Sequence, residues 1–272
     1  GVPGTGMGVL PVAAGAGAMG GHPDAGLEVL EDLSEDDVAK AKVMLDADKV
    51  TIKVKNVPNI LYVEASLFAG GDQATVVIED EHTNIVHIQK NDEVIYSQRA
   101  EKAEDETENK LHHLALTMTV KEVWDFAMEA PLDMVDFILE AAEMNEQISE
   151  EGLKGDYGLR VGKTMAKNVD RGILQEDLLT EIIKRSSAAS DARMDGCTLP
   201  VMTNSGSGNQ GIAATIPVVV TAEKVGATRE QLIRALILSH LEAIHIKAHL
   251  DRLSALCALT VAATGSGCGM VY

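Results

Sequence analysis

The fold of this chain is decided by VTIKVKNV (residues 50–57), ILYVEASLFA (60–69), ATVVIEDEH (74–82), NIVHIQK (84–90) and EVIYSQ (93–98). Each segment is short, rich in β-branched residues and alternates apolar with polar side chains, as strands with one buried face do. The separators NVPN, GGD, EHT and ND are typical turn sequences. We therefore expect an antiparallel meander between Lys49 and Gln98, with one or two helices covering one face.

Helical patterns precede the meander. Residues 12–21 (VAAGAGAMGG) are almost entirely Gly and Ala, which is typical of a helix that lies very close to another backbone. Ser34, with Asp37 three residues later, predicts the N-cap of a second helix that ends near Ala47. Residues 1–100 are thus expected to form an α/β sheet domain, incomplete at its N-terminal end.

The rest of the chain is expected to be helical. A charge run at 99–110 (RAEKAEDETENK) marks the boundary between two domains. Capping boxes are predicted at Thr119 and Thr228, and Pro131 is expected to begin a helix. One continuous helix is expected over about residues 160–186.

These patterns together define the fold class. Residues 110–272 are expected to form a helical domain, incomplete at its C-terminal end, in which the long apolar stretch 231–263 is central. The chain is therefore predicted to be an α+β protein, with a small antiparallel β-sheet domain and its covering helices followed by an all-helical domain.

Composition narrows the classes of partner and compartment. Only 3% of the residues are aromatic, so the core must be built from Ala, Val, Ile, Leu and 11 Met, which favours closely packed helices. The net charge of −19 argues against a nucleic-acid partner. No apolar run is long enough for a membrane span, and no signal peptide opens the chain. Three cysteines argue against a disulfide framework, so we expect a cytoplasmic protein. The Gly/Ala-rich and Met-rich surface favours a homodimer.

The most unusual segment is NSGSGNQG, between the apolar runs 199–202 (LPVM) and 212–220 (IAATIPVVV). One interpretation is a tight turn between helices, with Gly at positive φ. The other is a pocket, because small residues expose backbone N–H groups and a helix that begins near Gly211 would direct its positive end at an anion such as an amino-acid carboxylate. The residues of this candidate binding loop are Asn204, Ser205, Gly206, Ser207, Gly208, Asn209 and Gln210.

Polar residues on the long apolar stretch are the other candidates. His245 and His249 have a spacing that can bind a metal, but Ile246 stands where a zinc protease needs Glu, and such pairs more often line a core or face solvent. Lys247 either extends its ammonium group to solvent or serves a site as a cation. Cys257, by itself, is typical of a small buried hydrophobic residue.

Three segments carry a resemblance to a known family: 71–86 (GDQATVVIEDEHTNIV), 192–219 (ARMDGCTLPVMTNSGSGNQGIAATIPVV) and 232–257 (LIRALILSHLEAIHIKAHLDRLSALC). With the opening GVPGTGM and the following HPDAGLEVL, they resemble the serine dehydratase α-chain-like proteins, closest to the iron–sulfur L-cysteine desulfidases and their uncharacterised relatives.

The resemblance implies a lyase that uses no pyridoxal phosphate. Such enzymes hold a [4Fe–4S] cluster by three thiolates, and the open iron acts as a Lewis acid on the β-substituent of a small amino acid while a base removes the α-proton. The expected function is L-cysteine desulfidase activity, which yields pyruvate, ammonia and sulfide. The alternatives are L-serine ammonia-lyase activity and a non-catalytic amino-acid-binding protein of the same fold.

The resemblance also assigns individual residues. Cys257 matches the first cluster cysteine, which makes it the candidate metal ligand. His240, Lys247 and Arg252 match recurring polar positions, and His240 and Lys247 are the catalytic candidates. The polar loop matches a substrate-binding element. The residues of the matching HTN element, which has no assigned role, are His82, Thr83 and Asn84.

The chain also departs from the family pattern. The other cluster cysteines are expected beyond residue 272, and a Gly-Cys-Thr-Glu-Pro element is expected before residue 1. Cys197 lies in a similar GCTLP segment, but its surroundings place it where relatives carry an apolar residue, so we interpret it as a packing residue. Cys268 has no family role.

Overall fold

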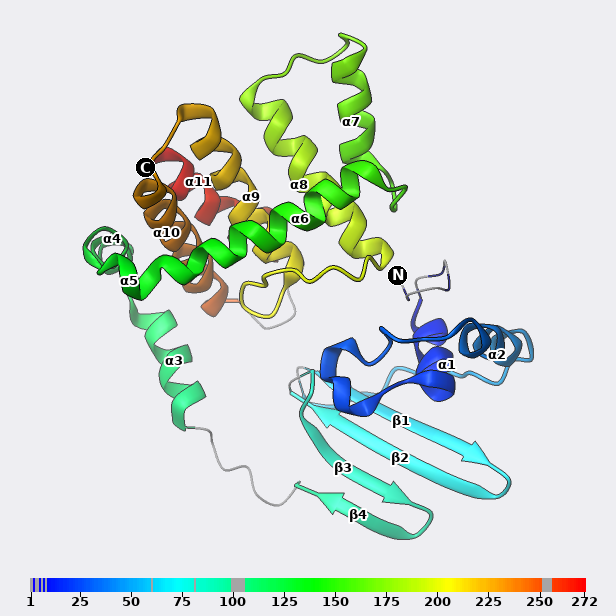
Figure 1. Ribbon diagram of the computed structural model, residues 1–272. Helices are drawn as coiled ribbons and strands as arrows, with labels where there is room; N and C mark the ends of the chain where they lie inside the picture. Colours follow the sequence, from blue (N-terminus) through cyan, green and yellow to red (C-terminus); the bar gives the residue numbers. More distant parts are fainter. Residues whose placement is uncertain are drawn as a thin grey trace. The chain divides into compact units, whose positions relative to one another are not determined.

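The computed structural model describes residues 2, 5, 7, 9–59, 61–80, 82–98, 106–250 and 256–272, with the backbone alone at 27, 106–109, 257 and 259. The chain divides into two compact units, Gly1–Glu106 and Thr107–Tyr272 (Figure 1). Each unit is described by itself below. Within the described ranges, no helix combines the length and the apolarity needed to cross a membrane.

The first unit contains a four-stranded antiparallel sheet in the order β1-β2-β3-β4, which confirms the predicted meander and the α+β class. Gly70 and Gly71, at φ of 60° and 98°, form the tight turn between the first two strands. The bounds of the strands are Tyr62–Ala69 (β1), Asp72–Glu79 (β2), Ile85–Lys90 (β3) and Glu93–Ser97 (β4).

The strand expected at 50–57 is absent, so this part of the prediction was wrong. Residues 50–57 have no ladder partner, although the alternation of apolar and polar side chains is present. Ile52 and Val54 are exposed rather than turned toward a core. Alternation predicts a strand only where one face is buried, and here neither face is.

Two helices of the first unit confirm the predictions made for them. Helix α1 (Leu10–Gly20) packs against α2 (Glu35–Asp46), and a short 3-10 helix, η1 (Pro23–Glu28), lies between them in the chain. A side chain at Gly15 would meet Ala41 at van der Waals distance, which explains the small residues of α1. Ser34 and Asp37 form the expected capping box at the start of α2.

The second unit is helical, as predicted. The capping boxes at Thr119 and Thr228 are both present. The helices of this unit are α3 (Glu106–Thr117), α4 (Val120–Glu129), α5 (Leu132–Val135), η2 (Asp136–Ile138), α6 (Leu139–Lys154), α7 (Val161–Asp170), α8 (Leu178–Asp195), α9 (Gly208–Val225), α10 (Arg229–Ala248), the π-helical η3 (Cys257–Ala262) and α11 (Ala263–Val271).

Two helix predictions in this unit need correction. The single helix expected over 160–186 is two helices, because Gly172 at φ 69° turns the chain after α7 and the Asp177 side chain caps α8. The apolar stretch 231–263, expected as part of the helical domain, is not one continuous helix, because α10, which follows Thr228, ends at Ala248.

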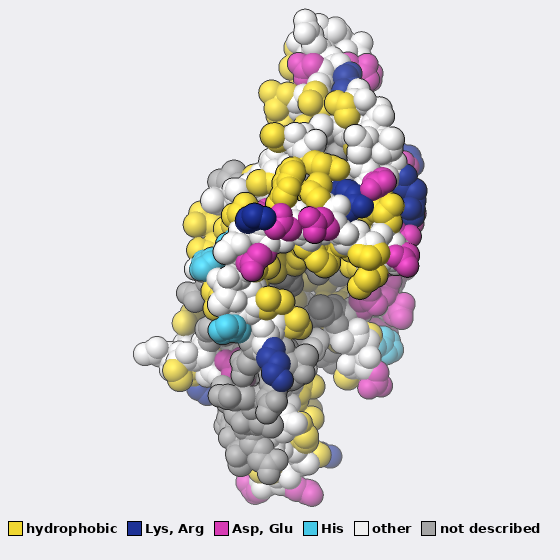
Figure 2. Space-filling model, turned by 90° about the vertical axis from the view of Figure 1, so that its left-hand side faces the viewer, with side chains coloured by type: hydrophobic (Ala, Val, Ile, Leu, Met, Phe, Trp, Pro, Cys, Tyr) yellow, Lys and Arg dark blue, Asp and Glu magenta, His cyan; other side chains and the backbone are white. Residues whose placement is uncertain are grey.

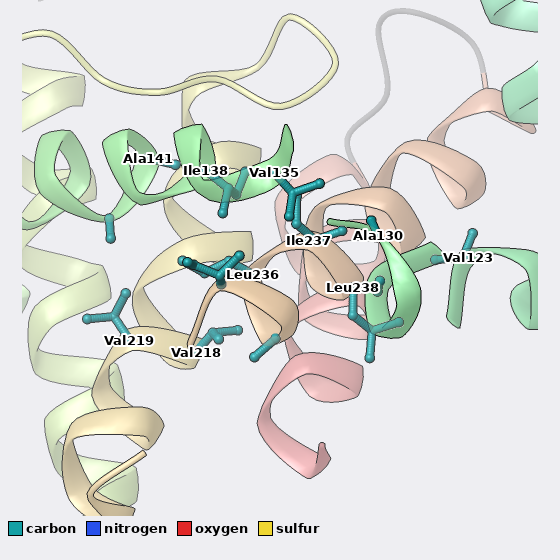
Figure 3. Close-up of a cluster of buried hydrophobic side chains, with 14 residues drawn as sticks. Val123, Ala130, Val135, Ile138, Ala141, Val218, Val219, Leu236, Ile237 and Leu238 are labelled. Carbon is teal, nitrogen blue, oxygen red and sulfur yellow. The ribbon is translucent and has the colours of Figure 1, made fainter. Parts of the chain in front are cut away.

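Helix α9 lies at the centre of the second unit, in contact with α6, α8, α10 and α11. It contributes Val218 and Val219 to a large hydrophobic cluster with α4, α6 and α10, which Figure 3 shows. On another side it contributes Ile212 and Ile216 to a second cluster with α6 and α8. The start of α9 is the polar loop predicted as a binding site.

Some large hydrophobic side chains of this unit stay exposed, among them Trp124, Phe126 and Met134. Figure 2 shows one face of the molecule, on which hydrophobic and charged side chains are interspersed. The homodimer remains a prediction.

Candidate functional site

The first half of the polar loop is a tight turn. The Asn204 N–H donates to the Ser207 carbonyl at 3.1 Å, and the Ser207 N–H donates to the Asn204 carbonyl at 3.0 Å. The two central residues, Ser205 and Gly206, have φ of 48° and 75°, which is the geometry of a type I′ turn. The turn interpretation therefore accounts for these four residues, although not for the rest of the loop.

The second half of the loop is the first turn of α9. The helix begins at Gly208, three residues before the expected start, because the Ser207 hydroxyl caps it by accepting a hydrogen bond from the Gln210 N–H at 3.3 Å. A Cβ atom at Gly208 would lie 2.2 Å from Nε of Arg193, and one at Gly211 would lie 1.9 Å from the Met202 carbonyl oxygen. At Gly211 the backbone thus leaves no room for a side chain, whereas at Gly208 the side chains of Arg193 and Val201 would have to move.

A buried chain of hydrogen bonds connects the loop to α10. Gln210 Nε2 donates to Asn204 Oδ1 at 2.6 Å. Asn204 Nδ2 in turn donates to both Nδ1 and the carbonyl oxygen of His240, each at 3.1 Å. All three side chains are buried, so Asn204 and Gln210 of the loop face the interior of the helical unit.

The chain of hydrogen bonds continues from His240 to α6. Thr215 Oγ1 lies 3.0 Å from His240 Nε2 and donates to the Gly211 carbonyl at 2.7 Å. Asn145 Nδ2 donates to the same Thr215 oxygen at 3.1 Å, and Asn145 Oδ1 accepts from the Met202 N–H at 3.1 Å. Helices α6, α9 and α10 are therefore joined by polar contacts directly beneath the loop.

The donors and acceptors of this network determine the state of His240. Since the Thr215 hydroxyl gives its only proton to a carbonyl, it must accept from Nε2–H of His240. Nδ1 of His240 then accepts from Asn204, so the ring is a neutral Nε2–H tautomer. Burial lowers the pKa of His240 to about 4, which also favours the neutral ring.

Arg193 of α8 supplies a cation at the loop. Its Nη1 donates to Asn209 Oδ1 at 3.2 Å, next to the first turn of α9. Arg193 was not predicted from the sequence, and neither were the buried Asn145 and Thr215. A polar residue within a buried apolar helix was the available indication of such a network, because a buried polar group needs a hydrogen-bond partner.

The remaining sequence candidates lie elsewhere or outside the described residues. Lys247 is buried on α10, two helical turns or roughly 10 Å from His240 along the axis. Cys257 begins η3, but its side chain lies outside the described residues, as does Arg252. The described side chains include no group of three or more His, Cys, Asp or Glu placed to hold a metal ion.

Other residues singled out from the sequence have ordinary contacts. Nδ1 of His245 lies 2.9 Å from the Ala115 carbonyl oxygen, and the ring packs edge-on against His249. Cys197 packs against the cluster formed by α6, α8 and α9, as expected of a packing residue. The segment containing His82, Thr83 and Asn84 lies between β2 and β3 in the first unit.

Fold and site together define an α+β protein in which a buried polar network meets the amino-terminal end of a central helix. Residues 24–272 match the serine dehydratase alpha chain family, and the chain belongs to this family. This confirms the family expected from the resemblance. No solved structure matches the chain.

The chain is similar to several curated proteins. It is 51% identical over 269 residues to a UPF0597 protein of Chromobacterium violaceum. It is 49% identical over 271 residues to UPF0597 protein YE0448 of Yersinia enterocolitica, and 52% identical over 272 residues to UPF0597 protein YhaM of Escherichia coli O157:H7. These matches cover 99–100% of this chain and 62% of each relative. The chain thus spans less than two thirds of their length.

Proposed function

We propose that the polar loop binds the carboxylate of a small amino acid, and that the protein is a lyase of the L-cysteine desulfidase type, with L-serine ammonia-lyase activity as the nearest alternative. The observation that carries the proposal is the position of Arg193 beside the first turn of α9. The family supports lyase chemistry in general. The choice between cysteine and serine rests on the resemblance.

The loop has the chemistry that a carboxylate requires. The N–H groups of Gly208 and Asn209, in the first turn of α9, have no acceptor within the helix. The helix dipole adds positive potential at this end, and the Arg193 guanidinium provides a charged donor. Three features that each favour an anion therefore occur together at the loop.

The [4Fe–4S] cluster is a separate part of the proposal. Among the described residues, Cys197 and Cys268 each pack against a different hydrophobic cluster, so they do not form a common ligand set. The described residues thus do not fit a three-thiolate site. Cluster binding through Cys257 rests on the resemblance alone, and the contributions assigned to this chain are to bind and orient the amino acid.

A non-catalytic amino-acid-binding protein is the second candidate. Both ring nitrogens of His240 are engaged in hydrogen bonds, and the pKa of this side chain is low. A general base must have a free nitrogen within reach of the substrate proton, which His240 lacks in this arrangement. That observation favours a binding role unless Lys247 serves as the base.

Titration calorimetry with L-cysteine and L-serine tests the binding site. Arg193→Met should weaken binding about ten- to a hundredfold, because a hydrogen bond between two charged groups is lost. Asn209→Ala should weaken it less, because it removes one hydrogen-bond partner of Arg193 and leaves the charge in place. The matched control is Arg171→Met, since Arg171 is exposed at the end of α7. Wild-type affinity in a folded Arg193→Met protein would show that the loop does not bind the carboxylate.

Product analysis separates the candidate activities. With protein of the relatives' full length, pyruvate and sulfide from L-cysteine would support the desulfidase. Pyruvate and ammonia from L-serine alone would support the ammonia-lyase. Binding without pyruvate from either amino acid would favour the non-catalytic protein.

A further inference from the structure

One polar atom of the buried network has no hydrogen-bond partner. Gln210 is 0% exposed, and its Oε1 atom neither meets a donor among the described residues nor reaches solvent. Its neighbours Asn204, His240 and Thr215 all have partners in the network. A buried acceptor without a donor is destabilising, and it is uncommon unless a water or a ligand supplies the missing donor.

The orientation of the Gln210 amide follows from the network. A backbone carbonyl can only accept, so Asn204 must direct its Nδ2 group at the His240 carbonyl and its Oδ1 atom at Gln210. Gln210 must then present Nε2 to that oxygen, because the opposite orientation would place two oxygen atoms 2.6 Å apart. The unpartnered atom of Gln210 is therefore an acceptor, and it requires a donor.

The position of Gln210 relates this acceptor to the anion site. Gln210 follows Asn209 directly in the first turn of α9, where Arg193 and the N–H groups of Gly208 and Asn209, which have no acceptor within the helix, favour a carboxylate. In an α-amino acid the ammonium group is one carbon away from the carboxylate. A single ligand can thus supply an anion to the helix end and a charged donor to Gln210.

We propose that Gln210 Oε1 accepts a hydrogen bond from the substrate's α-ammonium group and makes the site selective for amino acids over carboxylic acids that lack the amino group. This inference rests on the proposed function, in which the loop binds the carboxylate. Because Gln210 is fully buried, the exposed turn at Ser205 and Gly206 must shift to admit the ligand. Ser205 donates to the same Asn204 oxygen as Gln210 does, so this turn lies next to Gln210.

The test compares L-alanine with propanoate, which differ by the ammonium group and carry no β-substituent that could be eliminated. Calorimetry should show that the wild-type protein prefers L-alanine. Gln210→Met, which has a similar length and no comparable acceptor, should lower L-alanine affinity about ten- to a hundredfold and leave propanoate affinity unchanged.

The control is Thr215→Val, which removes a hydroxyl whose hydrogen bonds are to Asn145, Gly211 and His240 and not to Gln210. It should leave the ratio of the two affinities as in the wild type, whatever it does to stability. Equal losses for both ligands in Gln210→Met would overturn the ammonium assignment and leave the carboxylate site standing. A wild-type protein that binds both ligands equally would also overturn the assignment, even if the methionine variant does not fold. Absence of binding by either ligand would overturn the proposed function as well.

Discussion

At the scale of single residues, the neutral state of His240 makes stability depend on pH. The ring has a pKa of about 4 in the folded protein, against 6.5 in the absence of burial. Between these values the unfolded chain binds a proton that the folded protein does not, so stability decreases as the pH falls through this window. Protonation in the folded state would also place an N–H group of the ring against Asn204 Nδ2.

We expect the urea concentration at the unfolding midpoint of the wild-type protein to decrease when the pH is lowered from 7.5 to 5. By pH 4 the titration of His240 should have lowered the free energy of unfolding by roughly 3 kcal/mol. His240→Gln keeps one donor and one acceptor but cannot titrate, so the variant should show a weaker pH dependence. Parallel curves for the two proteins would mean that His240 is protonated in the folded state or contributes nothing.

The residues of the site were only partly predictable. The loop residues were identified because three glycines and five polar side chains between apolar runs are unusual. Arg193 was missed because its contact with Asn209 depends on how α8 packs against α9, which local sequence does not indicate. Asn145 was missed for the same reason, since its partner Thr215 is 70 residues away in the chain.

At the scale of elements, the turn before α9 and the first turn of α9 each contain a glycine that we expect to matter for stability. Gly211→Ala should destabilise the protein by about 2 kcal/mol or more, because the new methyl group would overlap the Met202 carbonyl and force the backbone apart. Gly206→Ala should cost about 1 kcal/mol, because that position has open space and only the positive φ opposes a side chain.

Urea unfolding of the two alanine variants measures both effects. A larger loss for Gly206→Ala than for Gly211→Ala would contradict the packing explanation, since it would make the turn conformation the main reason for the glycines. The same geometry shows that a valine at Gly208 would displace Arg193. Gly208→Val would therefore disturb the anion site directly.

Helix starts were more predictable than strands and helix ends. The caps at Ser34, Thr119 and Thr228 are local arrangements of four residues, and all three are present. The strand expected at 50–57 failed because a strand needs a neighbour and a core, and both are long-range properties. Gly172 was a local indication of a helix end, but the apolar periodicity on both sides of it favoured one continuous helix.

At the scale of the whole molecule, the iron–sulfur proposal makes a prediction about Cys257. Protein of the relatives' full length, purified without oxygen, should contain iron and sulfide and show broad visible absorbance. Cys257→Ser should remove most of the iron, because a cluster ligand is lost. Cys197→Ser should retain it, since Cys197 packs against an apolar cluster.

Iron and sulfide analysis of the two variants gives the result without an activity assay. Unchanged iron in Cys257→Ser would remove Cys257 as a ligand, and iron lost only in Cys197→Ser would assign the cluster to the other cysteine. A wild-type protein without iron would argue against the cluster altogether.

The central place of α9 has a consequence for how the helical unit opens. Because this helix supplies buried side chains to both hydrophobic clusters, neither cluster can come apart without exposing part of the other. Amide hydrogens of α6, α8 and α10 should therefore exchange with solvent deuterium in one cooperative step, instead of helix by helix. A ligand held at the first turn of α9 would slow that exchange throughout the unit, far from the atoms that it touches.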